Sequence, residues 1–432
     1  MENISSLIKE LESLPKGYIS KKNIKGKTYF YLQYIENGKI KSIYLKKDEL
    51  DDVLLKLKRR QYIEEKLKQF KKKHSPLIIS DNLKSFTGYL MMGDIQVGEF
   101  SKGNVISLDL NKCPLYIKRT NDISSYFKNR ILDLTRPNAR VLLKVLGILN
   151  KEELVSVYCY GACISDNYWF KPKGSDKKYS DIAFDNDLYS DLALEGKILQ
   201  LTNIGSPSPE LTNTGSFEKC WKYIDGLWWM YKKGNDDQIF SEIFTSSFAS
   251  LIGVNSIKYE YDNGYVRSQN FADRYNFEPL FSLMGDNEDY NSVFNVLYSM
   301  DESFALDYLK LLWLDVLTYN VDRHNNNIGF LRNKKTGAII SLAPNFDNNL
   351  SLVSYNKTLD QDPNKDYLIK IFLDFLKINK NANALFKTIL MEEITKKDIQ
   401  NIINNIPVKV KYKNIDDFIL NRYQYIKSKQ AN

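Results

Sequence analysis

The stretch NVDRHNNNIGFL, residues 320–331, concentrates chemically active side chains between two apolar segments. The segment before it, DYLKLLWLDVLTY (307–319), has the apolar spacing of a buried helix, and the tail IGFL has that of a strand. A strand-turn-strand pattern, IGFLRNKKTGAIISLAP, follows and leads to Asp347 in APNFDNN. A short polar loop and a hairpin are therefore expected to bring Asp322, Asn327 and Asp347 to one point.

Three such groups suit phosphoryl transfer from a nucleotide. That reaction needs a carboxylate facing the acceptor hydroxyl and oxygen ligands that hold Mg²⁺ against the phosphates. The two histidines, His74 and His324, form no cluster for a transition metal, so any metal is expected to be a hard, oxygen-bound ion. An Asp-x4-Asn pair also occurs by chance, and polar loops after helices often only cap them, so further residues are required.

Two further motifs lie upstream. GLWWMYKK (226–233) predicts a strand that ends at Lys232 or Lys233, and QIFSEIFTSSFASLIGV (238–254) predicts a helix that carries Glu242. A kinase needs a lysine for the nucleotide phosphates and a carboxylate that orients this lysine. A Lys-Glu pair alone is unremarkable, but its position before the Asp-Asn-Asp set favours a kinase.

A segment rich in small residues precedes the lysine strand. In NIGSPSPELTNTGSFEKCWKYI (203–224), small side chains allow backbone N–H groups to approach phosphate oxygens. Gly215 and Ser216 are the residues that we expect against the nucleotide. The segment is not a G-x-G-x-x-G loop, so the pattern alone does not define a site.

Positive charge is concentrated in residues 1–76, which carry 19 lysines and arginines against 10 aspartates and glutamates, a net +9 in a chain of net +8. Apolar alternation around the turns IKGK and ENGK predicts a β-meander, followed by a long helix. Aromatic residues interleave with the lysines at Tyr29, Phe30, Tyr31 and Tyr34. These rings suit base stacking, which would indicate nucleic-acid binding. A half-buried strand with a solvated basic face is the alternative.

The rest of the composition argues against a disulfide-rich, a membrane-spanning or a secreted protein. Four cysteines in 432 residues make no disulfide framework, and we expect buried, reduced thiols. No window approaches the roughly 18 apolar residues of a membrane helix, and the N-terminus lacks the order of a secretory signal. We therefore expect a cytoplasmic protein with no membrane association. YLMMGDIQVGEF predicts a hairpin, RVLLKVLGILNKEELVSVY a helix, and GACISDNYWFKPKGSDKKYSDIAFDNDLYSD an irregular, structural docking surface.

Taken in order, these motifs resemble those of the HipA-like serine/threonine kinases, including the shorter CtkA-type members. GACISDNYWFKPKG resembles the loop before the kinase core, SPELTNTGSFEKCW the Ser/Gly-rich segment, WWMYKKG the lysine strand, IFSEIFTSSFASLIGV the glutamate helix, NVDRHNNNIGF the catalytic loop and LAPNFDNN the metal-binding segment. The family pattern Asp-x-His-x-x-Asn followed by Ala-Pro-x-x-Asp is present in full. The resemblance spans roughly residues 85–380 and does not cover residues 1–76.

The resemblance implies the following roles: Asp322 as catalytic base, Asn327 and Asp347 as Mg²⁺ ligands, and Lys232, oriented by Glu242, as the contact to the ATP phosphates. It implies phosphorylation of a protein Ser or Thr, with a translation component as a candidate substrate and a DNA-binding antitoxin as a candidate partner. Residues 1–76, which the resemblance does not cover, are a candidate contact to nucleic acid.

The implied architecture is an α+β, two-lobed protein-kinase-like fold of the HipA type with N-terminal accessory domains. We expect a basic β-meander plus helix module at 1–76, an accessory domain at 77–195, a kinase small lobe at 196–265 and a helical large lobe at 266–432. Two alternatives stay open. One is a nucleic-acid-associated pseudokinase; the other is a small-molecule phosphotransferase, disfavoured because position 320 is Asn where antibiotic kinases carry His.

The loop over the phosphates also contains several hydroxyl groups, at Ser206, Ser208, Thr212, Thr214 and Ser216. The resemblance implies that such a loop can be autophosphorylated and swing outward. The reason is electrostatic, because an added charge of about −2 cannot sit beside nucleotide phosphates.

Overall fold

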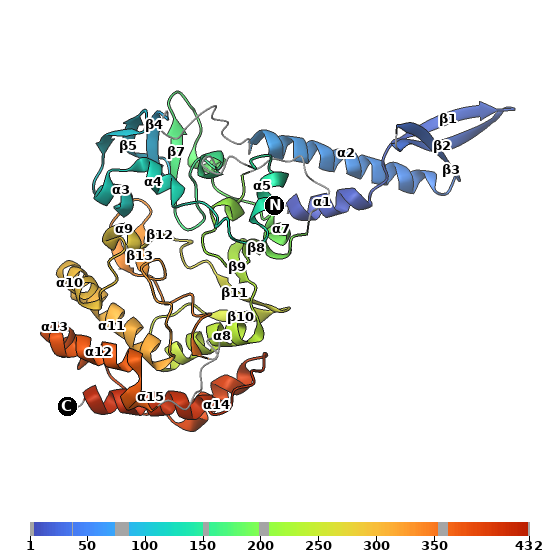
Figure 1. The fold of residues 1–432 in the computed structure, drawn as a ribbon. Helices are drawn as coiled ribbons and strands as arrows, with labels where there is room; N and C mark the ends of the chain where they lie inside the picture. Colours follow the sequence, from blue (N-terminus) through green and yellow to red (C-terminus); the bar gives the residue numbers. More distant parts are fainter. Residues whose placement is uncertain are drawn as a thin grey trace.

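The computed structural model describes residues 4–36, 38–73, 86–149, 155–197, 207–352 and 362–430. Figure 1 shows a projecting N-terminal module, a first body around one sheet, and a second body in which a small sheet leads into helices. Sheets and helices occur together throughout, which agrees with the predicted α+β class. His74 and the predicted linker at 74–77 lie outside the described residues. Within the described ranges, no helix is long and apolar enough to span a bilayer.

The N-terminal module contains α1 (Ile4–Ser13), β1 (Tyr18–Ile24), β2 (Lys27–Glu36), β3 (Lys39–Leu45) and α2 (Leu50–Lys73). The three strands form an antiparallel sheet in the order β1-β2-β3, so the predicted meander is confirmed. One sheet face packs on the start of α2 through Leu32, Leu45 and Leu57.

Both helices of this module join the first body. Leu7 and Ile8 of α1 and Ile63 of α2 share a hydrophobic cluster with Leu142 and Leu143. Burial of these side chains fixes the helices, at roughly 25 cal/mol per Å² of apolar surface removed from water. The β1–β3 sheet, in contrast, extends away from the rest of the chain (Figure 1).

The first body is built on a four-stranded sheet in the order β6-β5-β4-β7. Its elements are β4 (Gly88–Met92), β5 (Ile95–Ser101), β6 (Asn104–Leu108), α3 (Leu115–Thr120), α4 (Ile123–Lys128), α5 (Ala139–Val145), α6 (Val155–Tyr158), β7 (Tyr168–Pro172), η3 (Tyr179–Asp181) and α7 (Ser190–Glu195). The predicted β4–β5 hairpin is confirmed. The predicted helix over 140–158 is present as α5 and α6, and residues 150–154 lie outside the described residues.

Strand β7 corrects one prediction. The segment around Tyr168–Pro172 was expected to be irregular, but it pairs with β4 along its whole length. Trp169 and Phe170 are both buried, so the strand has apolar residues on both faces. A strand that is buried on both faces does not alternate polar and apolar residues. The sequence of β7 therefore lacks the alternation by which a strand is usually predicted.

The second body begins with a small sheet in the order β10-β11-β9-β8 and one long helix. The elements are η4 (Pro209–Thr212), β8 (Lys219–Ile224), β9 (Leu227–Lys232), α8 (Asp236–Leu251), β10 (Tyr259–Asp262) and β11 (Tyr265–Gln269). The predicted lysine strand and glutamate helix are thus confirmed as β9 and α8. Asn235 begins α8 with a capping box, accepting from the N–H of Gln238. Strand β11 crosses the boundary between the small and the large kinase lobe, which was predicted at 265/266.

The remaining elements are mostly helical: β12 (Tyr275–Pro279), α9 (Phe281–Met284), α10 (Tyr290–Met300), α11 (Glu302–Leu317), β13 (Gly329–Asn333), β14 (Ile339–Leu342), η6 (Pro363–Lys365), α12 (Tyr367–Ile378), α13 (Lys380–Phe386), α14 (Lys396–Asn405) and α15 (Ile415–Gln430). Helix α11 lies in the core, with Trp313 fully buried. Its cluster also contains Phe244 of α8 and Ile419 of α15. Helix α11 therefore gives a rigid base to the loop that follows it.

Candidate active site

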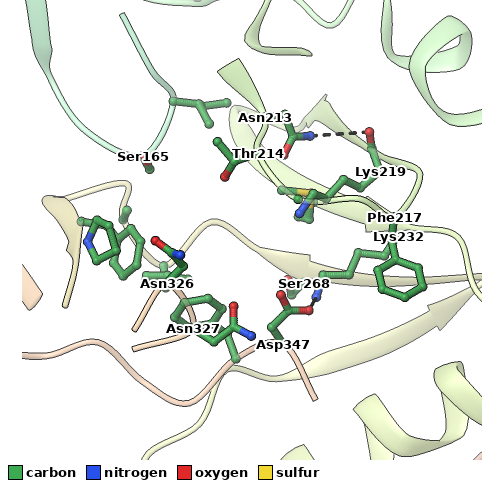
Figure 2. A pocket seen from close by; sticks show the side chains of 18 of the residues that line it. Ser165, Asn213, Thr214, Phe217, Lys219, Lys232, Ser268, Asn326, Asn327 and Asp347 are labelled. Atoms are coloured by element: carbon green, nitrogen blue, oxygen red, sulfur yellow. Dashed lines mark hydrogen bonds and ion pairs between the residues drawn. The ribbon is translucent and has the colours of Figure 1, made fainter. Parts of the chain in front are cut away.

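A cavity of about 580 Å³ lies between the small sheet, the loop after α11 and the first body. This volume falls within the range of small-molecule sites, roughly 300–1,000 Å³. The predicted site residues that line it are Gly215, Ser216, Lys232, Glu242, Asp322, Asn327 and Asp347. Figure 2 shows Lys219 and Lys232 reaching from the strands, with Asp347 at the end of the Lys232 side chain and Asn327 beside Asp347.

Lys232 joins the two carboxylates predicted to act with it. Its Nζ lies 2.7 Å from Glu242 Oε1 and 2.7 Å from Asp347 Oδ1. The adjacent Lys233 points elsewhere, because its Nζ contacts Glu218 at 3.2 Å and its side chain is largely exposed. Both lysines line the cavity, but Lys232 is the one that pairs with Glu242 and Asp347.

The surroundings of Lys232 keep it charged. Burial by itself disfavours an ammonium ion, but the carboxylates of Asp347 and Glu242 hold the pKa of Lys232 well above its usual range. Burial would likewise raise the pKa of Asp347, but Lys232 and Lys219 hold it well below its usual range. Glu242 is fully buried and also accepts the N–H of Asn348 at 2.8 Å. Both carboxylates thus face a fixed positive charge.

The backbone at Asp347 has a left-handed conformation, with φ of 62°. Asp tolerates this region better than most residues because its short side chain bonds locally. The N–H of Asp347 donates to the hydroxyl of Tyr259 at 3.0 Å, and that hydroxyl lies 3.4 Å from Lys232 Nζ. Tyr259 on β10 therefore helps to hold the Asp347 carboxylate toward the cavity.

Asp322 and Asn327 share the loop after α11. The Asn327 side chain donates from Nδ2 to the carbonyl of Asp322 at 3.2 Å, and its own N–H donates to the His324 carbonyl at 2.8 Å. These contacts fix the amide and leave its oxygen for a ligand. Partial burial raises the pKa of Asp322 above its usual value. His324 Nδ1 accepts the Asn326 N–H at 3.2 Å, which suits the supporting role expected of it.

Arg323 is a residue whose role the sequence did not indicate. Its buried guanidinium binds both carboxylate oxygens of Asp315 on α11, each at 2.8 Å. It also donates to the Asn327 carbonyl at 2.8 Å and to the Phe346 carbonyl at 3.1 Å. One side chain therefore joins α11, the polar loop and the segment that carries Asp347. A planar group with five donors suits this role better than a lysine.

A second missed residue, Arg136, holds the small-residue loop. Arg136 comes from the first body and is buried, and its Nη2 donates to the carbonyls of Asn213 at 2.5 Å and Gly215 at 2.8 Å. Gly215 has φ of 93°, and a Cβ there would lie 2.6 Å from Lys219 Nζ. The positive φ therefore favours glycine, and any other residue would also require the end of the Lys219 side chain to move.

Lys219 is the third missed residue, and a signal for it existed. The tight turn at Asp225–Gly226 sets the β8–β9 register, which places Lys219 directly opposite Lys232. Burial lowers the pKa of Lys219 to about 8, with Asp347 acting in the opposite direction. Pairing residues outward from the Asp-Gly turn predicts that Lys219 and Lys232 are cross-strand neighbours, with both side chains on one side of the sheet.

The hydroxyl groups of the loop differ in exposure. Ser208 and Thr212 are buried, and the Thr212 hydroxyl donates to the Pro209 carbonyl at 3.2 Å. Thr214 and Ser216 are exposed at the edge of the cavity. Ser206 lies outside the described residues.

Comparison with known proteins gives partial matches. A family model described as a domain of unknown function (DUF6788) matches residues 2–54. No curated protein matches the chain. The solved structure of the proinflammatory kinase CtkA from Helicobacter pylori aligns with a TM-score of 0.39 and 20% identity, covering 49% of this chain and 90% of that one. HipA of Shewanella oneidensis MR-1, in complex with HipB and operator DNA, aligns with a TM-score of 0.47 and 16% identity, covering 80% and 96%.

Proposed function

We propose that this chain is an ATP- and Mg²⁺-dependent serine/threonine protein kinase with a two-lobed, HipA-like arrangement. The observation that carries the proposal is the position of Lys232 between Glu242 and Asp347, in a cavity that Asp322 and Asn327 also line. Incubation with labelled ATP and Mg²⁺, followed by phosphosite mapping, tests it. The protein substrate and an antitoxin partner stay predictions of the sequence resemblance.

The residues of the cavity fit a bound metal and nucleotide. Mg²⁺ is commonly held by one or two protein oxygens together with phosphates and waters. Asp347 offers a carboxylate held below its usual pKa, and Asn327 offers an amide oxygen that its own loop leaves available. When bound, the ion would neutralise negative charge on the transferred phosphoryl group.

Different side chains of this protein would then bind the nucleotide phosphates and activate the acceptor hydroxyl. Lys232 and Lys219 would bind phosphate oxygens from the sheet side, while Arg136 holds the loop at Gly215 in place. The Asp322 carboxylate, partly exposed to the cavity, would orient the acceptor hydroxyl and accept its proton. Closure of the cavity around these groups would strengthen each interaction by excluding water.

The pseudokinase alternative is less well supported. A chain that only docked partners would have no need to hold all seven predicted site residues in one cavity, with charges paired at Lys232. The small-molecule alternative is also less well supported, because Asn320, which stands where antibiotic kinases carry His, donates to Asp315 Oδ1 at 2.9 Å. Asn320 therefore connects the polar loop to α11 and has a structural role.

A pH profile tests Lys219. The pKa of Lys219 is lowered to about 8 in the free protein, so the ammonium is present below this pH and lost above it. Since phosphate binding needs the charged form, we expect kcat/KM for ATP to fall by up to about tenfold per pH unit above pH 8. Lys219→Arg, which keeps its charge, should abolish this fall. Initial rates between about pH 6.5 and about pH 9.5 give the profile.

The matched control is Lys233→Arg, because Lys233 is exposed and lies one residue beyond the cavity lysine. This variant should keep the wild-type profile. An unchanged fall in Lys219→Arg would show that another group titrates, and would remove Lys219 from phosphate binding.

Exposure narrows the expected sites of autophosphorylation. After incubation with ATP, mass spectrometry should find phosphate on Thr214 or Ser216 and not on the buried Ser208 or Thr212. Asp322→Asn should carry none. An added charge of about −2 would repel nucleotide phosphates, so modified protein should bind ATP less tightly. Wild-type protein without phosphate in residues 207–216 would contradict this regulation and leave the kinase proposal intact.

A further inference from the structure

The β1–β3 sheet of the N-terminal module has two different faces. The inner face packs on α2 through Leu32 and Leu45, together with Ile19 and Phe30. Side chains alternate along a strand, so Tyr34 belongs to the same inner face as Leu32. Phe30 and Tyr34, two of the rings that the sequence indicated for base stacking, therefore lie on the opposite side of the sheet from Tyr29 and Tyr31.

The outer face carries the other tyrosines. The register pairs Ser20 with Tyr31 and Tyr31 with Tyr44, so these three side chains lie in one row across the sheet. The rings of Tyr31 and Tyr44 are 5.6 Å apart, and those of Tyr29 and Tyr44 are 6.1 Å apart. Lys22 Nζ lies over the Tyr31 ring at 5.0 Å. The outer face thus presents a continuous aromatic cluster.

The cluster is partly exposed to water, with Tyr29 and Tyr31 half-buried. Tyr44 is 52% exposed and Tyr18, further along the same face, is 59% exposed. Gln33 and Ser42 lie beside them on that face and share a hydrogen bond of 3.1 Å. The sheet projects from the body (Figure 1), and the outer face is the one that does not pack on α2. Exposed aromatic groups with adjacent polar groups mark binding surfaces.

The charge around the aromatic cluster indicates the chemical class of its ligand. Residues 18–47 contain eight lysines and one glutamate. Of the lysines, Lys22 and Lys27 lie on the outer face by alternation, and Lys25 lies in the first turn. The other strand lysines, Lys21, Lys39 and Lys41, have inner-face positions near the same edges of the sheet. Aromatic rings beside positive charge complement a ligand that has both flat bases and phosphates.

We propose that the outer face of β1–β3 binds single-stranded nucleic acid. The rings of Tyr31 and Tyr44 stack on unpaired bases, and the lysines contact the phosphates. A duplex hides the faces of its bases and leaves only phosphates for the lysines, so the single strand binds more tightly. This site is separate from the cavity, and it does not rest on the proposed kinase activity.

Fluorescence anisotropy with the full-length protein tests the proposal. The probes are a labelled oligonucleotide of about 20 nucleotides and a duplex of the same sequence, at ~50 mM salt. We expect the single strand to bind at micromolar protein or below, more tightly than the duplex. Tyr31→Ala and Tyr44→Ala together should weaken it by about tenfold or more. Tyr44→Phe, which keeps the ring, should bind like the wild type.

Two controls separate stacking from charge and from loss of fold. Tyr367→Ala alters a tyrosine that is 68% exposed on α12, outside the module, and should leave binding unchanged. Lys22→Ala should reduce the slope of log affinity against log salt by about 0.7. Lack of single-strand binding under these conditions would overturn the proposal. Equal binding of duplex and single strand by a protein insensitive to the tyrosine substitutions would overturn it as well.

Discussion

Asp347→Asn is expected to reduce phosphotransfer by about 10²-fold or more, on the order of 3 kcal/mol of transition-state stabilisation. The Asp347 carboxylate contacts Lys232 at 2.7 Å, the same distance as the Glu242 carboxylate, and is the less buried of the two. Asparagine keeps the size and one oxygen but removes the charge. The rate of self-labelling from γ-labelled ATP, or of ADP release, measures the effect.

The matched control is Asp374→Asn on α12, whose carboxylate pairs with Lys377 at the surface. This variant should retain the wild-type rate, since exposed ion pairs contribute little. Thermal unfolding of both variants separates lost chemistry from lost fold. A wild-type rate in a folded Asp347→Asn protein would remove Asp347 from the site.

Lys232→Ala is expected to have two effects. Phosphotransfer should fall by about 10²-fold or more, because a phosphate-binding cation is lost. The free energy of unfolding should also fall by about 3 kcal/mol, because Glu242 is fully buried and would lose its cation. Initial rates measure the first effect, and urea unfolding measures the second.

A double variant distinguishes the two effects. Lys232→Ala combined with Glu242→Gln removes the buried carboxylate together with its cation, so stability should recover while activity stays lost. Lys233→Ala is the control for position and should behave like the wild type in both measurements. Greater damage from Lys233→Ala than from Lys232→Ala would place the phosphate contact one residue further along the chain.

The site residues that the sequence indicated share one property. Asp322, Asn327 and Asp347 lie within one loop and hairpin, so local spacing brings them together. Lys232 and Glu242 lie on a strand and the helix directly after it. Within each group, local structure carries the geometry. The contact between Lys232 and Asp347 spans 115 positions, so the prediction that the two groups meet rested on the order of the motifs in the family resemblance.

The residues that the sequence did not indicate depend on distant contacts. Arg136 reaches Gly215 across 79 positions, and Arg323 connects Asp315 on the helix before it with Asn348 beyond the hairpin, through a buried network that no motif marks. No spacing rule relates such residues, because only the packed fold brings them close. Tyr44 belongs to the outer face of its sheet through strand register alone. Register follows from turn geometry, and one position of error exchanges the two faces.

Transfer of γ-labelled phosphate in the presence of Mg²⁺, compared between the wild type and Asp322→Asn, tests the central claim most directly. Asp322 lines the cavity and is only partly buried, so its substitution should leave the fold intact, and unfolding curves check this. The account predicts label on serine or threonine of the wild-type protein and about 10²-fold less in Asp322→Asn. Wild-type protein that neither binds ATP nor transfers label, or equal labelling of both proteins, would contradict it.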